Sequence, residues 1–225
     1  MKTFFKFLAI TSSVFVYSQQ TQQVNQGMGY EFFPTKSVTS NGKTLKYEDI
    51  IGTPYADTDF KMAKLADNYE EVPVRYNSYK DEVEFKKGEN IQIVPKQKEL
   101  SRITIKKPLQ TIVNLETNDN LQGYFFELVS GKIALYKKEK TIFKDEALAI
   151  NSYASSKPAE FIKQNPVYYI SIGNQFIKKP KNQKEIIEAL PNLKNQINAF
   201  IKENKIKLNK EEDLIKLVNF LNQQS

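Results

Sequence analysis

Apolar and polar residues alternate along the middle of the chain, which is the pattern of β-strands with one buried face. The alternation is clearest at 72–76, 83–85 and 91–93, and it continues at 103–105 and 110–115. Further strand-like segments at 123–129, 132–138, 167–172 and 175–178 are paired into hairpins by their turns. Short polar turns such as Ser130-Gly131 and Gly173-Asn174 separate several of these segments. Closely spaced strands of this kind predict a mainly antiparallel β domain over residues 43–178, built as a curved sheet or a partial barrel. Pro73 lies inside one strand pattern, which predicts an edge or a bulge there.

After Pro180 the apolar spacing changes to three or four residues, which indicates helices. Asn182 followed by Glu185 matches a helix-capping pattern. The helix that begins there should be broken at Pro191. Apolar residues then recur at helical spacing over 193–201 and 214–221. We therefore expect an α+β fold, in which the β domain is followed by a tail of two or three short helices at 181–225. The amphipathic tail should pack on the sheet.

The first eighteen residues have the three parts of a secretory signal peptide. Lys2 and Lys6 give a positive start, a mostly apolar run follows from 7 to 16, and Ser18 precedes the polar Gln19 at the expected cleavage site. The run is too short for the ~20 residues of a membrane-spanning helix. These features predict an exported protein with no transmembrane segment, whose residues 19–42 form an extended N-terminal arm.

Cysteine and histidine are both absent from the sequence, which limits the covalent links, the catalytic mechanisms and the metal sites that the protein can have. Without cysteine the chain forms no disulfide and carries no lipoprotein anchor, so we expect a periplasmic or extracellular protein that is not lipid-anchored. Without histidine, Ser-His-Asp and Cys-His catalysis is excluded, and zinc is not expected. Carboxylate, lysine or tyrosine chemistry remains, and the sequence indicates no cofactor.

The formal net charge is +7, from 33 basic and 26 acidic residues. A basic excess can indicate nucleic acid as a partner, but export places the protein in the wrong compartment. Arginine, which is preferred for phosphate and base contacts, occurs only at 75 and 102. We therefore expect the lysines to solvate the surface and predict no nucleic-acid binding.

One polar cluster supplies the candidate binding residues: Arg75, Asn77, Asp81, Glu82 and Glu84. On an extended strand Arg75 and Asn77 share one face, while Val74 and Tyr76 share the other. Asp81 and Glu82 should lie at a bend, and Glu84 should resume the alternation outward.

Two interpretations of this cluster are open. In the functional one, Arg75 orients an anionic or carbonyl group and a carboxylate acts as acid or base. A glycosidase would need two carboxylates about 5–10 Å apart across a cleft. In the structural one, which we favour, Arg75 pairs with a carboxylate to fix a strand-turn-strand corner, and Asn77 forms a local turn hydrogen bond. We predict no catalytic and no metal-binding residue.

The chain also has 15 Phe and 12 Tyr, which could line a groove for lipid or glycan. Neighbouring rings at 124–126 and 168–169 should point to opposite faces of a strand, so we expect core packing. A lipid carrier would need a large apolar cavity lined by Phe85, Phe125 and Tyr169. Asn118-Asp119-Asn120 could offer oxygen ligands to calcium but lacks a closing Glu, so a plain turn is expected there.

Several runs of residues resemble an uncharacterised family of exported proteins in Bacteroidota. They are Gly52-Thr53-Pro54-Tyr55 with Asp59-Phe60, the stretch 72–85, the pair 124–128 and 131–138, and 200–205 with Glu211, Glu212 and Asp213. The resemblance covers most of the chain after the signal peptide. It implies an envelope location and a β body with a helical tail, and it assigns no reaction and no catalytic residue.

From these observations we expect a non-catalytic exported envelope protein that acts as a binding or accessory module. Its partner would be another envelope protein or a cell-surface polymer. One alternative is a carboxylate-based glycan hydrolase that uses Asp81, Glu82 or Glu84. The other alternative is a lipid carrier built on the curved sheet.

Overall fold

A computed structural model describes residues 33–117, 119–147, 149, 155–178, 180 and 182–224. The signal peptide expected at 1–18 lies outside the described residues, as does most of the arm expected at 19–42. The structure is an antiparallel sheet followed by short helices, so the α+β fold is confirmed. No helix within the described ranges is long and apolar enough to cross a membrane.

Ten strands form the main sheet, in the order β14-β13-β10-β9-β8-β7-β3-β4-β5-β6. In chain order they are β3 (Lys61–Lys64), β4 (Glu71–Asn77), β5 (Glu82–Lys87), β6 (Asn90–Ile93), β7 (Arg102–Ile105), β8 (Gln110–Leu115), β9 (Gly123–Val129), β10 (Ile133–Lys138), β13 (Val167–Ile172) and β14 (Gln175–Lys178). Every neighbouring pair is antiparallel. The sheet stays open, with β14 and β6 as its two outer strands.

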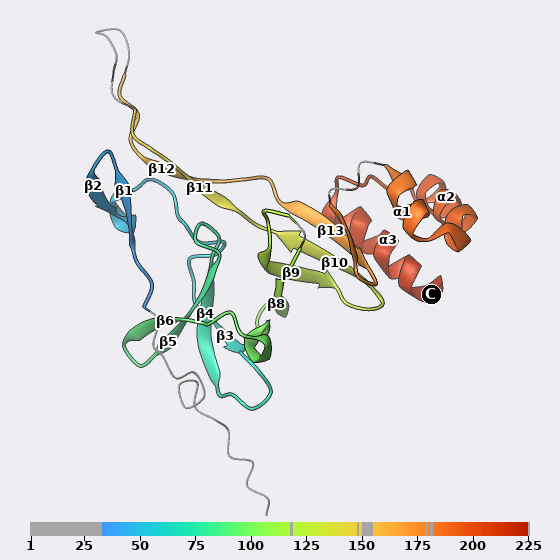
Figure 1. Ribbon diagram of the computed structural model, residues 1–225, viewed down its shortest axis with the longest axis horizontal. Helices are drawn as coiled ribbons and strands as arrows, with labels where there is room; N and C mark the ends of the chain where they lie inside the picture. Colours follow the sequence, from blue (N-terminus) through green and yellow to red (C-terminus); the bar gives the residue numbers. More distant parts are fainter. Residues whose placement is uncertain are drawn as a thin grey trace, which may run out of the picture.

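Two smaller two-stranded sheets lie beside the main sheet. The strands β1 (Ser37–Ser40) and β2 (Lys43–Lys46) form a hairpin, so β1 occupies the end of the expected arm. The strands β11 (Thr141–Lys144) and β12 (Glu160–Lys163) extend β10 and β13 into a ribbon that leaves the main sheet on the side away from the helices (Figure 1). Short 3-10 turns at Tyr47–Asp49, Lys98–Leu100 and Pro191–Leu193 complete the connections.

The main sheet is strongly curled around its first core. The rings of Tyr76 in β4 and Tyr124 in β9 meet edge-on with centroids 6.2 Å apart, although three strands separate β4 from β9 in the sheet. Buried residues of both strands, including Val74, belong to the same apolar cluster, which Phe85 of β5 also joins. The expected curved sheet is therefore confirmed.

Pro73 does not mark an edge strand or a bulge, because β4 lies inside the sheet in regular register with β3. Pairing with β5 begins only at Val74, which leaves Pro73 paired with Met62 of β3 alone. The prediction of an edge strand or a bulge was wrong for the strand as a whole. The missing N–H of Pro73 is tolerated because pairing between β4 and β5 starts only at the next residue.

Three helices form the tail: α1 (Gln183–Ala189), α2 (Lys194–Glu203) and α3 (Glu211–Gln224). The side chain of Asn182 accepts a hydrogen bond from the amide of Lys184, which caps α1 as the sequence predicts. The helix ends before Pro191, and a 3-10 turn leads into α2. The tail buries its apolar faces against one face of β9, β10, β13 and β14, where Leu214 and Leu217 join Leu135 and Ile170 in a second core.

Asn222 near the end of α3 ties the helical tail to the start of β10. Its side-chain Oδ1 accepts a hydrogen bond from the amide of Ile133 at 3.0 Å, and its Nδ2 donates to the carbonyl of Ile133 at 2.7 Å. The side chain thus pairs with the backbone as a neighbouring strand would. Gly131 makes room for it, because a Cβ at that position would lie only 2.7 Å from Oδ1.

We predict that Asn222→Ala lowers the free energy of unfolding by about 1–3 kcal/mol, since it leaves two backbone groups of Ile133 without partners. The exposed Asn219 on the same helix supplies the matched control, and Asn219→Ala should change stability little. Urea titration followed by circular dichroism measures both variants. Equal effects of the two substitutions would show that the hydrogen bonds of Asn222 do not hold the tail.

Candidate functional site

Arg75 and Glu84 face each other across β4 and β5 and form a buried ion pair. The guanidinium Nε and Nη2 both donate to Glu84 Oε2, at 2.9 and 2.8 Å. The hydroxyl of Tyr55 donates to the other carboxylate oxygen at 3.3 Å and accepts from Arg75 Nη2 at 2.7 Å. Glu84 has no exposed surface, so all of its partners come from the protein.

The guanidinium of Arg75 also lies against two aromatic rings. Its central carbon is 3.7 Å from the ring centroid of Tyr55 and 4.4 Å from that of Phe60. Both rings come from the segment before β3, which covers this side of β4. The expected outward position of Glu84 was therefore wrong, because alternation fixes the face of a strand but not what covers that face.

Asn77 is the last residue of β4 and Glu82 is the first residue of β5, so they lie on either side of the turn. Asn77 Oδ1 accepts hydrogen bonds from the amides of Tyr79 and Lys80 at 3.2 and 3.0 Å, which confirms the predicted turn contact. Glu82 is half-buried at the first position of β5, and burial raises the pKa of its carboxyl. Burial raises the pKa of the nearby Tyr47 to about 12, and contact with Asn77 offsets part of that shift.

Asp81 ends the same turn and is surrounded by donors. Its Oδ1 accepts from the hydroxyl of Tyr76 at 2.8 Å, from Lys138 Nζ at 2.6 Å and from the amide of Tyr124 at 3.1 Å. Its Oδ2 accepts from Lys96 Nζ at 2.6 Å. Lys138 is itself nearly buried, and burial lowers the pKa of its ammonium group. This carboxylate is held as part of a structural ion cluster.

The structure brings the five predicted residues together but gives the carboxylates different surroundings. Glu84 points to the face of β4 and β5 that carries Arg75, while Asp81 bonds Tyr76 of the opposite face. Two carboxylates that flank one glycosidic bond must face the same cleft. Asp81 and Glu84 do not have that geometry, and the structural interpretation of Arg75 and Asn77 accounts for their contacts.

We predict that Glu84→Gln destabilises the fold by about 3–5 kcal/mol, because it leaves the buried guanidinium of Arg75 without its counter-charge. The exposed Lys144–Glu160 pair on the ribbon is the matched comparison. Removing that pair by Glu160→Gln should cost less than about 1 kcal/mol. Guanidinium chloride unfolding measures the loss in free energy of unfolding for both variants. A loss for Glu84→Gln as small as that for Glu160→Gln would contradict the structural role given to the Arg75–Glu84 pair.

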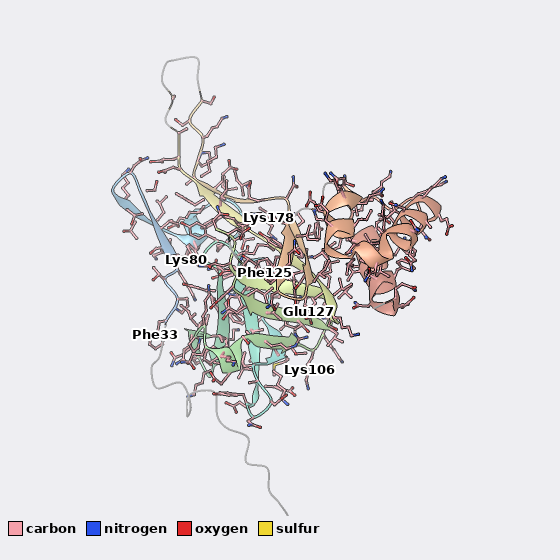
Figure 2. The ribbon with its side chains drawn as sticks, turned by 45° about the vertical axis from the view of Figure 1, so that its right-hand side comes forward. Phe33, Lys80, Lys106, Phe125, Glu127 and Lys178 are labelled. Carbon is pink, nitrogen blue, oxygen red and sulfur yellow. The ribbon has the colours of Figure 1, made fainter. Side chains whose placement is uncertain are left out.

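A second candidate surface lies on the face of β9, β10, β13 and β14 that the helices leave uncovered. Tyr136 of β10 is opposite Tyr169 of β13, and Phe176 of β14 follows on the same face. The centroids of Tyr136 and Phe176 are 6.4 Å apart. Both rings are half-buried, whereas their neighbours Tyr169 and Phe125 on the same face are fully buried. We call this surface the aromatic face (Figure 2, which labels Phe125, Glu127 and Lys178).

A pocket of about 310 Å³ opens at the β14 end of the aromatic face. Its lining combines two aromatic rings with charged, amide and hydroxyl groups: Thr117, Asp119, Tyr169, Asn174, Gln175, Phe176 and Lys178. The turn between β13 and β14 supplies the side-chain amide of Asn174, and the start of β14 supplies that of Gln175; both residues are exposed. The pocket can therefore offer hydrogen-bond donors and acceptors beside an apolar ring.

Asp119 anchors the loop that forms one wall of this pocket. Its Oδ2 accepts from the hydroxyl of Tyr169 and from Lys178 Nζ, both at 2.7 Å, and its Oδ1 accepts from the amide of Leu121 at 2.9 Å. Burial alone would raise the pKa of Asp119, but the hydrogen bonds from Lys178 and Tyr169 outweigh it and hold the pKa well below the ordinary value.

The sequence offers the carboxylate of Asp119 as a possible calcium ligand. In the structure this carboxylate is paired with the ammonium group of Lys178. Asn118 of the same run lies outside the described residues. No cluster of three or more acidic side chains that could hold a metal ion occurs in the described ranges.

At the other end of the aromatic face, Arg102 of β7 pairs with Glu127 of β9. Glu127 is opposite Tyr136, and burial raises the pKa of that tyrosine, with a further rise from the charge of Glu127. Arg102 also lines a polar pocket of about 370 Å³ with Lys64 and Thr104. Polar pockets thus lie at both ends of the half-buried aromatic pair.

The three rings considered for a lipid cavity do not share one lining. Phe85 packs in the core of the curled sheet, while Phe125 and Tyr169 pack with Tyr136 and Phe176 on the aromatic face. The sequence indicated that neighbouring rings would separate to opposite faces, and they do: Tyr124 joins the core of the curled sheet and Phe125 the other cluster. It missed Tyr136 and Phe176, which no local pattern distinguishes from core residues.

No protein-family model matches this chain, and neither the curated proteins nor the solved structures contain a significant match.

Proposed function

We propose that the protein is a non-catalytic exported protein that binds a carbohydrate polymer of the cell envelope at the aromatic face. The observation that carries the proposal is the half-exposed pair of Tyr136 and Phe176 beside the polar pocket of about 310 Å³. The signal peptide expected at 1–18 supports an envelope location.

The chemistry of this surface suits a sugar. A sugar ring has a face of C–H groups that packs on an aromatic ring, and hydroxyls at its rim that need both donors and acceptors. Phe176 supplies the ring, and the exposed amides of Asn174 and Gln175 each supply a donor and an acceptor.

The carboxylates nearest to this surface support binding without hydrolysis. Asp119 is held by Lys178 and Tyr169, and Glu127 is held by Arg102. A general acid for glycoside cleavage needs a raised pKa so that it is protonated at neutral pH. The pKa of Asp119 is displaced in the opposite direction.

Affinity electrophoresis tests the proposal, with polysaccharide fractions purified from the native envelope cast into the gel. Wild-type protein lacking residues 1–18 should be retarded by one such fraction. Phe176→Ala and Tyr136→Ala should each weaken retardation by about tenfold or more, the loss expected when roughly 1.4 kcal/mol of ring contact is removed.

Phe33 is the control, because it is an exposed aromatic residue that is not part of the aromatic face. Phe33→Ala should bind like the wild type. If no fraction retards the wild-type protein, the proposed binding function is wrong. If the protein releases reducing sugar from the retarding fraction, its description as non-catalytic is wrong.

A further inference from the structure

A separate pocket of about 280 Å³ lies where the β11–β12 ribbon leaves the main sheet. Its polar lining comes from the β4–β5 turn and from both strands of the ribbon and the residues that flank them: Ser78, Glu139, Lys140, Thr141, Lys163 and Gln164. We call it the ribbon pocket. It contains none of the residues that line the aromatic face or the pocket beside it.

Backbone hydrogen bonds hold the walls of the ribbon pocket in place. The amide of Thr141 donates to the carbonyl of Ser78 at 3.1 Å, which joins the ribbon to the β4–β5 turn. The amide of Gln164 donates to the carbonyl of Lys140 at 2.8 Å, and Thr141 is opposite Lys163 in the ribbon. Lys140 directly precedes β11 and Lys163 ends β12, so the two lysines lie one position apart across the ribbon.

The charges in this pocket are unbalanced. Within the described part of the chain, the ammonium group of Lys140 makes no ion pair or hydrogen bond, and that of Lys163 donates only to the neutral carbonyl of Ala56, at 2.8 Å. The one carboxylate in the lining, Glu139, is already 3.3 Å from Lys137 Nζ. The charge of Lys163 also acts on Asp57, but that carboxylate is 2.6 Å from Lys61 Nζ. Both lysines thus line the pocket, and the acidic groups near them are shared with other lysines.

The hydroxyl groups of the pocket are already occupied. Ser78 Oγ donates to the carbonyl of Pro54 at 3.1 Å, so the 2.7 Å contact between Ser78 and Thr141 takes its proton from Thr141. Neither hydroxyl has a proton left for a ligand. Recognition in this pocket must therefore come from the two ammonium groups, with the amide of Gln164 beside them.

We propose that the ribbon pocket binds a phosphate group between Lys140 and Lys163. At neutral pH a phosphate monoester carries a charge of about −1.5 to −2, which matches two lysines better than a carboxylate with its single charge. Lysine binds phosphate as a point charge with rotatable donors, so it needs no fixed planar geometry. Inorganic phosphate and a sugar phosphate on an envelope polymer present the same group.

Isothermal titration calorimetry tests the site, with inorganic phosphate, glucose 6-phosphate and acetate as probes at low ionic strength. The double variant Lys140→Gln/Lys163→Gln should bind phosphate at least about tenfold more weakly, because both charges near the anion are removed. The loss should shrink as salt is added, since these charges are partly exposed. Acetate should bind more weakly than phosphate.

The control variant Lys184→Gln/Lys202→Gln changes the net charge equally on exposed positions of the helical tail. It should bind phosphate like the wild type, and both double variants should keep the wild-type melting temperature. Equal affinity for glucose 6-phosphate would assign the site to phosphate esters, and binding of inorganic phosphate alone would assign it to the free ion. If the wild type does not bind phosphate, or if both double variants lose the same phosphate affinity, the proposal is wrong. This result does not depend on whether the aromatic face binds a carbohydrate.

Discussion

The carboxylate of Asp81 is the contact on which the arrangement of the curled sheet depends. It belongs to the turn after β4, yet it binds the amide of Tyr124 at the start of β9 and the ammonium of Lys138 at the end of β10. Asp81 has a φ of 57°, a left-handed conformation that Asp and Asn adopt more readily than most residues. Gly123 is required opposite it, because a Cβ there would collide with the carboxylate.

This contact fixes the positions of both candidate binding sites. Lys138 is held by Asp81, and Tyr136 of the aromatic face precedes it on β10 by two residues. Lys140 of the ribbon pocket follows Lys138 by two residues. The ion cluster around Asp81 holds the end of β10, where the chain passes into the ribbon. The aromatic face and the ribbon pocket therefore lie on either side of one fixed segment.

Much of the fold could be predicted from the sequence, because β4, β5, β6 and β7 alternate apolar and polar residues and Asn182 caps α1. The ribbon could not, since Ile142 and Phe143 are adjacent apolar residues and give no clear period. The order of the strands could not be predicted from the sequence either. It depends on contacts between residues far apart in the chain, such as Tyr76 and Tyr124.

The charged residues of the candidate site could be predicted from the sequence, but the side chains that cover them could not. Arg75 and Glu84 stood out as charges in a strand pattern, but only the fold shows Tyr55 and Phe60 lying over them. Tyr136 and Phe176 looked like core residues, and their partial exposure follows from helices that pack on the opposite face alone.

The most direct test of this account is the free energy of unfolding of Asp81→Asn, which keeps the turn conformation and removes the charge. Losing the partner of the nearly buried Lys138 should cost about 3 kcal/mol or more, and the amide of Tyr124 should exchange its hydrogen faster. Asp67→Asn, at a fully exposed position, should leave stability unchanged. A cost for Asp81→Asn no larger than that of Asp67→Asn would contradict the central place given to Asp81.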